Sequence, residues 1–152
     1  MRLRRLTPGE RALIGKVFGA ALDPEPIWLL TGAATSRYAF VAVNLIVFPT
    51  EVADFAAEPV TTQGWFVHEL VHAWQFQHRP WWTLMNWVGI ALTGGYLTGR
   101  AYRYKLPLEW PAMNIEQQAK AVEHAFLLAR RTWAADIPAG AAMADYASVP
   151  FR

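Results

Sequence analysis

Hydrophobic positions follow a strand-like pattern early in the chain and a helical spacing later. Residues 27–31 and 38–48 are rich in Val, Ile, Phe and other side chains that favour strands, and Pro49 closes the second stretch. Asn44 marks a bend or bulge, so residues 38–48 are expected to form one or two strands. A small sheet is therefore predicted in the first third of the chain.

Capping signals predict a helix before this sheet. Thr7 and Glu10 form a capping box with Pro8 at the first helical position, and the helix is expected to run to Leu22. Residues 51–59, after the strands, are typical of a loop or a short helix.

Three further helices are predicted after residue 60. The first begins at a Thr cap and ends or bends at a proline, the second is mostly apolar and ends at a Gly pair, and the third begins at an Asn cap. The first is expected over residues 61–78, with Thr61 or Thr62 as its cap and Pro80 after its end. The second is expected over residues 82–93, before Gly94-Gly95, and the third over residues 115–132, after Asn114. The chain is then expected to continue as a loop and a short helix.

This order of elements predicts an α+β fold, in which a short β-sheet packs on the helix over residues 61–78 with further helices around it. With 152 residues and 54% hydrophobic positions, the chain is expected to form a single domain over residues 1–152. There is no cysteine, which excludes disulfides and thiolate metal ligands.

Charge adds little to this picture. The net charge is +2, and the basic residues near the N-terminus and at Arg130-Arg131 are better explained by a solvated surface than by a nucleic-acid partner. The N-terminal arginines are not followed by an apolar run with a cleavage site. We therefore expect no signal peptide and a cytoplasmic location.

One uncharged segment, between Arg79 and Arg100, has the length of a membrane span. Its Gly, Thr and Asn residues make it a poor one. We expect instead a buried helix, or docking on a membrane surface or a protein through residues 81–96, where Trp81, Trp82 and Trp87 would suit an interface.

The most specific chemical signal is the motif His68-Glu69-Leu70-Val71-His72, an H-E-x-x-H pattern. On a helix, residues four apart share one face, so His68 and His72 can aim their imidazoles at one point. Glu69 lies one residue further round and can hold a water bound to the metal. Two imidazoles and a carboxylate base predict a hydrolytic Zn²⁺ site.

Two residues compete for the third ligand that such a zinc needs. His78 completes a spacing used by metzincins, but Gln75 stands where those enzymes have glycine. If the helix continues through Gln75, His78 lies about 9 Å further along the axis and faces elsewhere. Glu116, in the first turn of the last helix, is favoured, while Glu109 and Glu123 are lesser alternatives and His124 falls on the opposite side of that helix.

The sequence Glu116-Gln117-Gln118-Ala119 matches the E-x-x-A pattern that follows H-E-x-x-H in small bacterial gluzincin domains, which the chain resembles. Residues 68–75, Tyr102-x-Tyr104, residues 114–119 and the opening Leu6-Thr7-Pro8-Gly9-Glu10 are also similar to a bacterial group of Vgr-related proteins. The first resemblance implies a zincin fold with His68, His72 and Glu116 on the metal. The second implies an association with contractile secretion machinery, and with it export by a specialised secretion system.

The chemistry implied is that of a zinc-dependent metallopeptidase acting on a peptide or protein substrate. The metal would activate a water, Glu69 would act as general base, and Tyr104, with Tyr102 or Arg103, would donate to the developing oxyanion. Gln75 is expected to orient a ligand, and Glu123 is expected to orient Glu116. The alternative is a non-catalytic domain that zinc stabilises, accessory to a secretion or contractile injection system.

Overall fold

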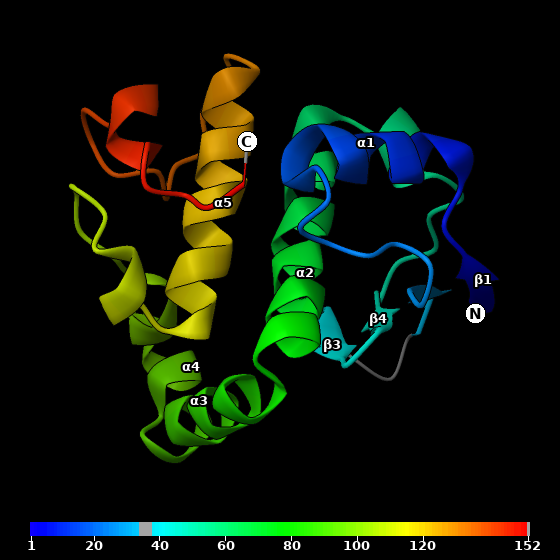
Figure 1. Ribbon diagram of the computed structural model, residues 1–152, viewed down its shortest axis with the longest axis horizontal. Coiled ribbons are helices and arrows are strands. Elements are labelled where there is room, and N and C mark those ends of the chain that lie inside the picture. Colours follow the sequence, from blue (N-terminus) through cyan, green and yellow to red (C-terminus); the bar gives the residue numbers. More distant parts are fainter. Residues whose placement is uncertain (34–37, 152) are drawn as a thin grey trace.

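A mixed four-stranded sheet forms one side of the molecule in the computed structural model, which describes residues 1–33 and 38–151 (Figure 1). Its strands are β1 (Arg2–Arg5), β2 (Trp28–Thr31), β3 (Phe40–Ala42) and β4 (Leu45–Val47). The order across the sheet is β1-β2-β4-β3, with β2 and β4 parallel and the other pairs antiparallel. Residues 38–48, predicted to form one or two strands, thus contain the antiparallel β3–β4 hairpin, and β3 is an edge strand.

Strand β1 was not predicted from the sequence, which assigned its arginines to a solvated surface. The strand pairs with β2, and the guanidinium of Arg4 forms an ion pair with the fully buried carboxylate of Glu10 at 2.7 Å. Glu10 also completes the predicted capping box of α1 (Pro8–Phe18). That helix ends before Leu22 because Gly19 takes a positive φ of 56° at its C-cap.

Two long helices, α2 (Val60–His78) and α5 (Ile115–Ala129), lie side by side and make the most extensive contact between elements (Figure 1). The sheet and α1 lie on the other side of α2. Pro59, rather than Thr61 or Thr62, is the N-cap of α2, so the predicted cap was wrong. Asn114 caps α5 as predicted, in a capping box with Gln117.

Shorter helices close one end of this pair. They are α3 (Pro80–Leu92) and α4 (Gly95–Thr98), with 3₁₀ turns at Phe55–Ala57, Arg100–Tyr102, Trp110–Ala112 and Met143–Tyr146. Pro80 begins α3 as a first-turn residue, and Gly94, at φ 66°, separates α3 from α4. No helix in the described part of the chain has both the length and the hydropathy needed to cross a bilayer. The α+β class with a small sheet and several helices is thus confirmed.

Candidate metal centre

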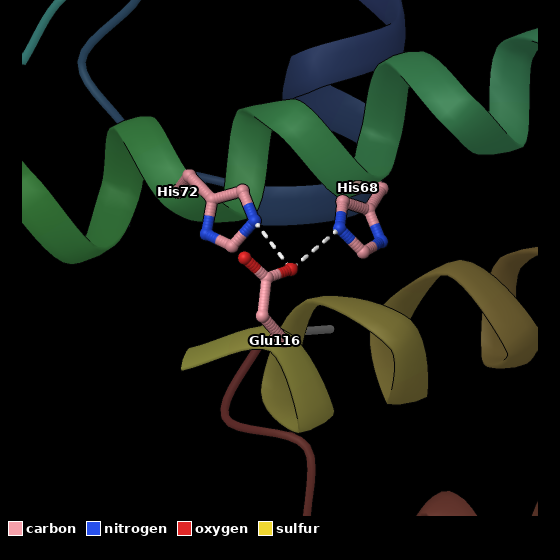
Figure 2. Close-up of side chains that lie close together, drawn as sticks. All are labelled: His68, His72 and Glu116. Carbon is pink, nitrogen blue, oxygen red and sulfur yellow. Dashed lines mark hydrogen bonds and ion pairs between the residues drawn. The ribbon is translucent and has the colours of Figure 1, made fainter. Parts of the chain in front are cut away.

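Three buried side chains from α2 and α5 meet at one point (Figure 2). His68 and His72, one turn apart on α2, aim their imidazoles at the carboxylate of Glu116 in the first turn of α5. Both Nε2 atoms approach the same oxygen, Glu116 Oε2, at 3.3 Å from His68 and 3.2 Å from His72. One potential ligand atom from each residue lies within 4.8 Å of the others, a spacing that could hold a metal ion.

The packing of α2 on α5 creates this meeting point. Gly64, one turn before the motif, faces α5, and a Cβ atom there would lie only 3.0 Å from Leu127 Cδ2. The missing side chain lets the two helices approach closely. At the other end, the capping box of Asn114 fixes the first turn of α5 and hence the position of Glu116.

Each imidazole is fixed by a polar contact at its Nδ1 atom. His68 Nδ1 contacts Glu123 Oε2 at 3.0 Å, and His72 Nδ1 contacts Gln75 Oε1 at 2.9 Å. The amide nitrogen of Gln75 donates to the carbonyl of Ile115 and to Gln118 Oε1, so its oxygen is the acceptor for the Nδ1–H of His72. These contacts leave both Nε2 atoms facing Glu116, the arrangement that histidine ligands of metals have.

Glu123 and Gln75 were expected to orient ligands. Gln75 contacts His72, in line with that expectation, but Glu123 contacts His68 rather than Glu116. The partner of Glu116 is instead Tyr96 of α4, whose hydroxyl donates to Glu116 Oε1 at 2.9 Å. Sequence reasoning missed Tyr96, because it precedes Glu116 by 20 residues and no spacing rule connects them.

The charges at the site are strongly coupled. Burial lowers the pKa of His68, but hydrogen bonds to Glu116 and Glu123 outweigh burial and raise that pKa to about 10. Burial alone would raise the pKa of Glu116, yet the charge of His72 and hydrogen bonds from both imidazoles hold it well below its usual range. The site thus favours positive charge beside an ionised Glu116.

Glu69 differs from the other two glutamates of the site, Glu116 and Glu123. Burial raises the pKa of its carboxyl group. Within residues 1–33 and 38–151 its carboxylate has no hydrogen-bond partner, whereas Glu116 and Glu123 each have at least two contacts. Glu69 is thus available to a ligand in the adjoining cavity.

That cavity, of about 800 Å³, has Glu69 and the three converging side chains in its wall. Tyr102 also lines it, with its ring centroid 6.4 Å from that of His68. The other lining side chains are uncharged and mostly apolar, and come from α2, the β3 hairpin, α3, α4 and the start of α5; they include Phe40, Val43, Phe76, Leu84, Trp87 and Leu97.

Several residues weighed from the sequence lie outside this cavity. Helix α2 continues unbroken through Gln75, so His78 is exposed at its end with Nδ1 on the carbonyl of Trp74. Glu109 is exposed before a 3₁₀ turn, and His124 is buried on another face of α5, beside Asp136.

Tyr104, expected to donate to an oxyanion, is not among the residues that line the cavity. Its hydroxyl contacts His124 Nδ1 at 2.6 Å and the hydroxyl of Tyr146 at 2.8 Å. These two contacts tie the segment after α4 to α5 and to the C-terminal 3₁₀ turn. Tyr102, two residues earlier, is the tyrosine of this pair that reaches the cavity.

Comparison with known proteins places this site in context. No protein-family model matches the chain. The chain is 32% identical over 139 residues to the type VI secretion system spike protein VgrG2b of Pseudomonas aeruginosa. That match covers 82% of the chain but only 13% of the length of the spike protein.

The solved structure of the effector domain of Pseudomonas aeruginosa VgrG2b resembles the chain in fold and in sequence. Its TM-score is 0.61 at 32% identity, and the match covers 84% of the chain and 75% of that domain. An identity of this size over most of both chains establishes common descent as well as a common fold. The chain belongs to the family of the VgrG2b effector domain.

Proposed function

We propose that the chain is a zinc-dependent peptidase domain that acts as an effector of a type VI secretion system. One observation carries the catalytic part: the ligand atoms of His68, His72 and Glu116 converge in the wall of one cavity, beside Glu69, whose carboxylate accepts no hydrogen bond from the described residues. The similarity to an effector domain of a secretion spike carries the biological part.

The donor set fits zinc. Two imidazole nitrogens and one carboxylate oxygen are a ligand set that catalytic zinc sites use, with a fourth position left for water or substrate. The Nδ1 contacts to Glu123 and Gln75 support this fit, because they keep both Nε2 atoms toward the centre. Bound zinc would act as a Lewis acid that activates water and polarises the scissile carbonyl.

Glu69 is the proposed general base. Its carboxylate lies in the cavity wall, is not engaged by a hydrogen bond from a described residue, and has a pKa that burial raises. Such a group can take a proton from the attacking water and return it to the leaving nitrogen. Glu116 is unsuited to this role, because its carboxylate is engaged by both imidazoles and by Tyr96.

Tyr102 replaces Tyr104 as the proposed donor to the developing oxyanion. Burial and the nearby charges of Glu116 and Glu69 raise the pKa of its phenol to about 12, so the hydroxyl stays protonated near neutral pH. Its place in the cavity wall allows a hydrogen bond to a substrate oxygen. Tyr96 is a positioning residue, because its hydroxyl donates to Glu116.

The test is turnover of a peptide library by the zinc-loaded chain and by Glu69→Gln, which keeps the shape of the side chain. We expect the variant to keep its zinc and to lose about a hundredfold or more of the hydrolysis rate. Glu109→Gln changes an exposed glutamate outside the cavity and should hydrolyse like the wild type. Equal cleavage by the Glu69→Gln variant would contradict the mechanism.

A non-catalytic domain is the second candidate, since the family membership associates the chain with a secretion spike without requiring turnover. Bound zinc with no cleavage of any library peptide, by wild type or by Glu69→Gln, would favour this accessory role.

A further inference from the structure

We propose that the exposed apolar face of α3 and α4 docks the domain on an anionic lipid surface, with the cavity opening beside it. This inference does not depend on whether the chain hydrolyses peptides. It rests on the composition and exposure of α3, on the opposite rim of the cavity, and on the charges that flank the two helices.

Helix α3 exposes apolar side chains of the kind that a surface helix normally buries. It has no charged residue, and only Thr83 and Ile90 are buried along it. Trp81 is 77% exposed, Met85 62% and Leu92 83%, and their spacing places these three side chains on one stripe of the helix. Leu97 of α4 is 94% exposed. A contiguous face of this kind marks an interaction site.

The other rim of the cavity is also apolar and exposed. Phe40 and Val43 of the β3 hairpin line the cavity and are about half exposed. Val43 has a φ of 60°, in the left-handed region that a β-branched residue adopts only with strain. A glycine or asparagine would relieve this strain, and an exposed valine there adds to the apolar rim.

The flanking charges select the kind of surface. Residues 70–108 contain four cations, Arg79, Arg100, Arg103 and Lys105, and no acidic residue, although the whole chain has a net charge of only +2. All four are exposed, and none forms an ion pair with a carboxylate of the described residues. Each cation near an anionic bilayer strengthens binding by about fivefold.

A lipid surface fits these observations better than a second copy of the chain. Two copies joined through this face would bring the same cations together without an acidic partner. The exposed Trp81 and Trp87 have the amphipathic rings that favour the bilayer interface. At 13 residues, α3 is too short to cross a bilayer, so it would lie in the interface.

The test is co-sedimentation of the chain with vesicles made of equal parts phosphatidylglycerol and phosphatidylcholine, compared with phosphatidylcholine alone. We expect salt-sensitive binding that prefers the anionic vesicles. The combined variant Trp81→Ser, Met85→Ser, Leu92→Ser should bind at least about tenfold more weakly, because three apolar side chains no longer enter the interface. None of these three residues lines the cavity.

Trp133→Ser is the matched control, since Trp133 is 55% exposed and follows the end of α5 at Ala129 in the sequence. That end of α5 lies away from α3 (Figure 1). It should bind vesicles like the wild type, and circular dichroism should show that both variants are folded. No binding by wild type, or equal binding by the combined variant, would overturn the proposal. So would self-association without vesicles that the combined variant abolishes, because the face would then belong to a second copy.

Discussion

At the scale of single residues, each imidazole of the candidate centre is fixed by what its Nδ1 atom contacts. Glu123 holds His68, and the amide of Gln75, itself anchored on α5, holds His72. Burial would raise the pKa of Glu123, but its hydrogen bond with His68 and its ion pair with Lys120 at 2.9 Å lower that pKa, so the carboxylate stays ionised. The geometry of the two ligands thus depends on residues that would not touch the metal.

Removal of this support should weaken metal binding without abolishing it. For Glu123→Ala we expect zinc affinity to fall by about 10- to 100-fold, because His68 loses the acceptor that orients it. Glu123→Gln keeps an acceptor oxygen and should lie between the alanine variant and wild type. Competition with a chromogenic zinc chelator measures all three. Equal affinities would mean that Glu123 has no role in holding His68.

Alanine variants of Glu116 and His78 are expected to differ more strongly in zinc affinity. Glu116→Ala removes a proposed ligand of the metal. The zinc affinity of this variant should therefore fall further than the about 10- to 100-fold expected when a residue that only orients a ligand is removed. His78→Ala alters an exposed residue at the end of α2 and should leave the affinity unchanged. Isothermal titration of both variants checks this order. The reverse order would exclude the site described for Glu116.

Much of this centre could be predicted from local spacing, and some of it could not. The placement of His68, Glu69 and His72 follows from helical geometry, and the cap at Asn114 placed Glu116 in a first turn. Tyr96 and Tyr102 reach the site only through the path of the chain between α3 and α5, where the sequence pattern was weak. The choice of Tyr104 over Tyr102 shows this limit, since the two differ by contacts that no periodicity encodes.

At the scale of elements, the packing of α2 against α5 decides whether the centre can form. Gly64 lies where the helices are closest, and Leu127 opposite it is 1% exposed. Gly15 is an exposed interior glycine of α1 with nothing within 4 Å of an added Cβ. The two glycines therefore offer a matched pair of substitutions.

Gly15→Ala should raise the free energy of unfolding by about 0.5–1 kcal/mol, because alanine favours the helix and meets no neighbour. Gly64→Ala should lower it, because crowding Leu127 costs about 1–3 kcal/mol and exceeds the same helical gain. Chemical denaturation measures both. Equal stabilisation by the two changes would show that α2 and α5 are not held as closely as described.

Element boundaries show where sequence reasoning was incomplete. Enrichment in strand-favouring side chains identified β2, β3 and β4, but β1 consists largely of arginines and has no such signal. Its place in the sheet depends on pairing with β2 and on the Arg4–Glu10 ion pair, which joins residues of different elements. The early end of α1 depends on the conformation of Gly19, which the pattern of apolar residues does not report.

At the scale of the whole molecule, three parts of the fold contribute to the site in different ways. The sheet with α1 lies on one side of α2, and α5 lies on the other side (Figure 1). Helix α5 supplies the third proposed ligand, and α3 with α4 forms a wall of the cavity. The chain corresponds to 13% of the VgrG2b spike protein in length, and it covers most of that protein's effector domain. The proposed chemistry is thus contained in one module of this family.

The central claim is that His68, His72 and Glu116 bind zinc, and the most direct measurement is the metal content of the chain by mass spectrometry. The protein should be purified without a histidine tag, supplied with zinc and freed of excess metal. We expect about one zinc per chain in the wild type and much less in Glu116→Ala. A wild-type protein with no bound metal under these conditions would contradict the account.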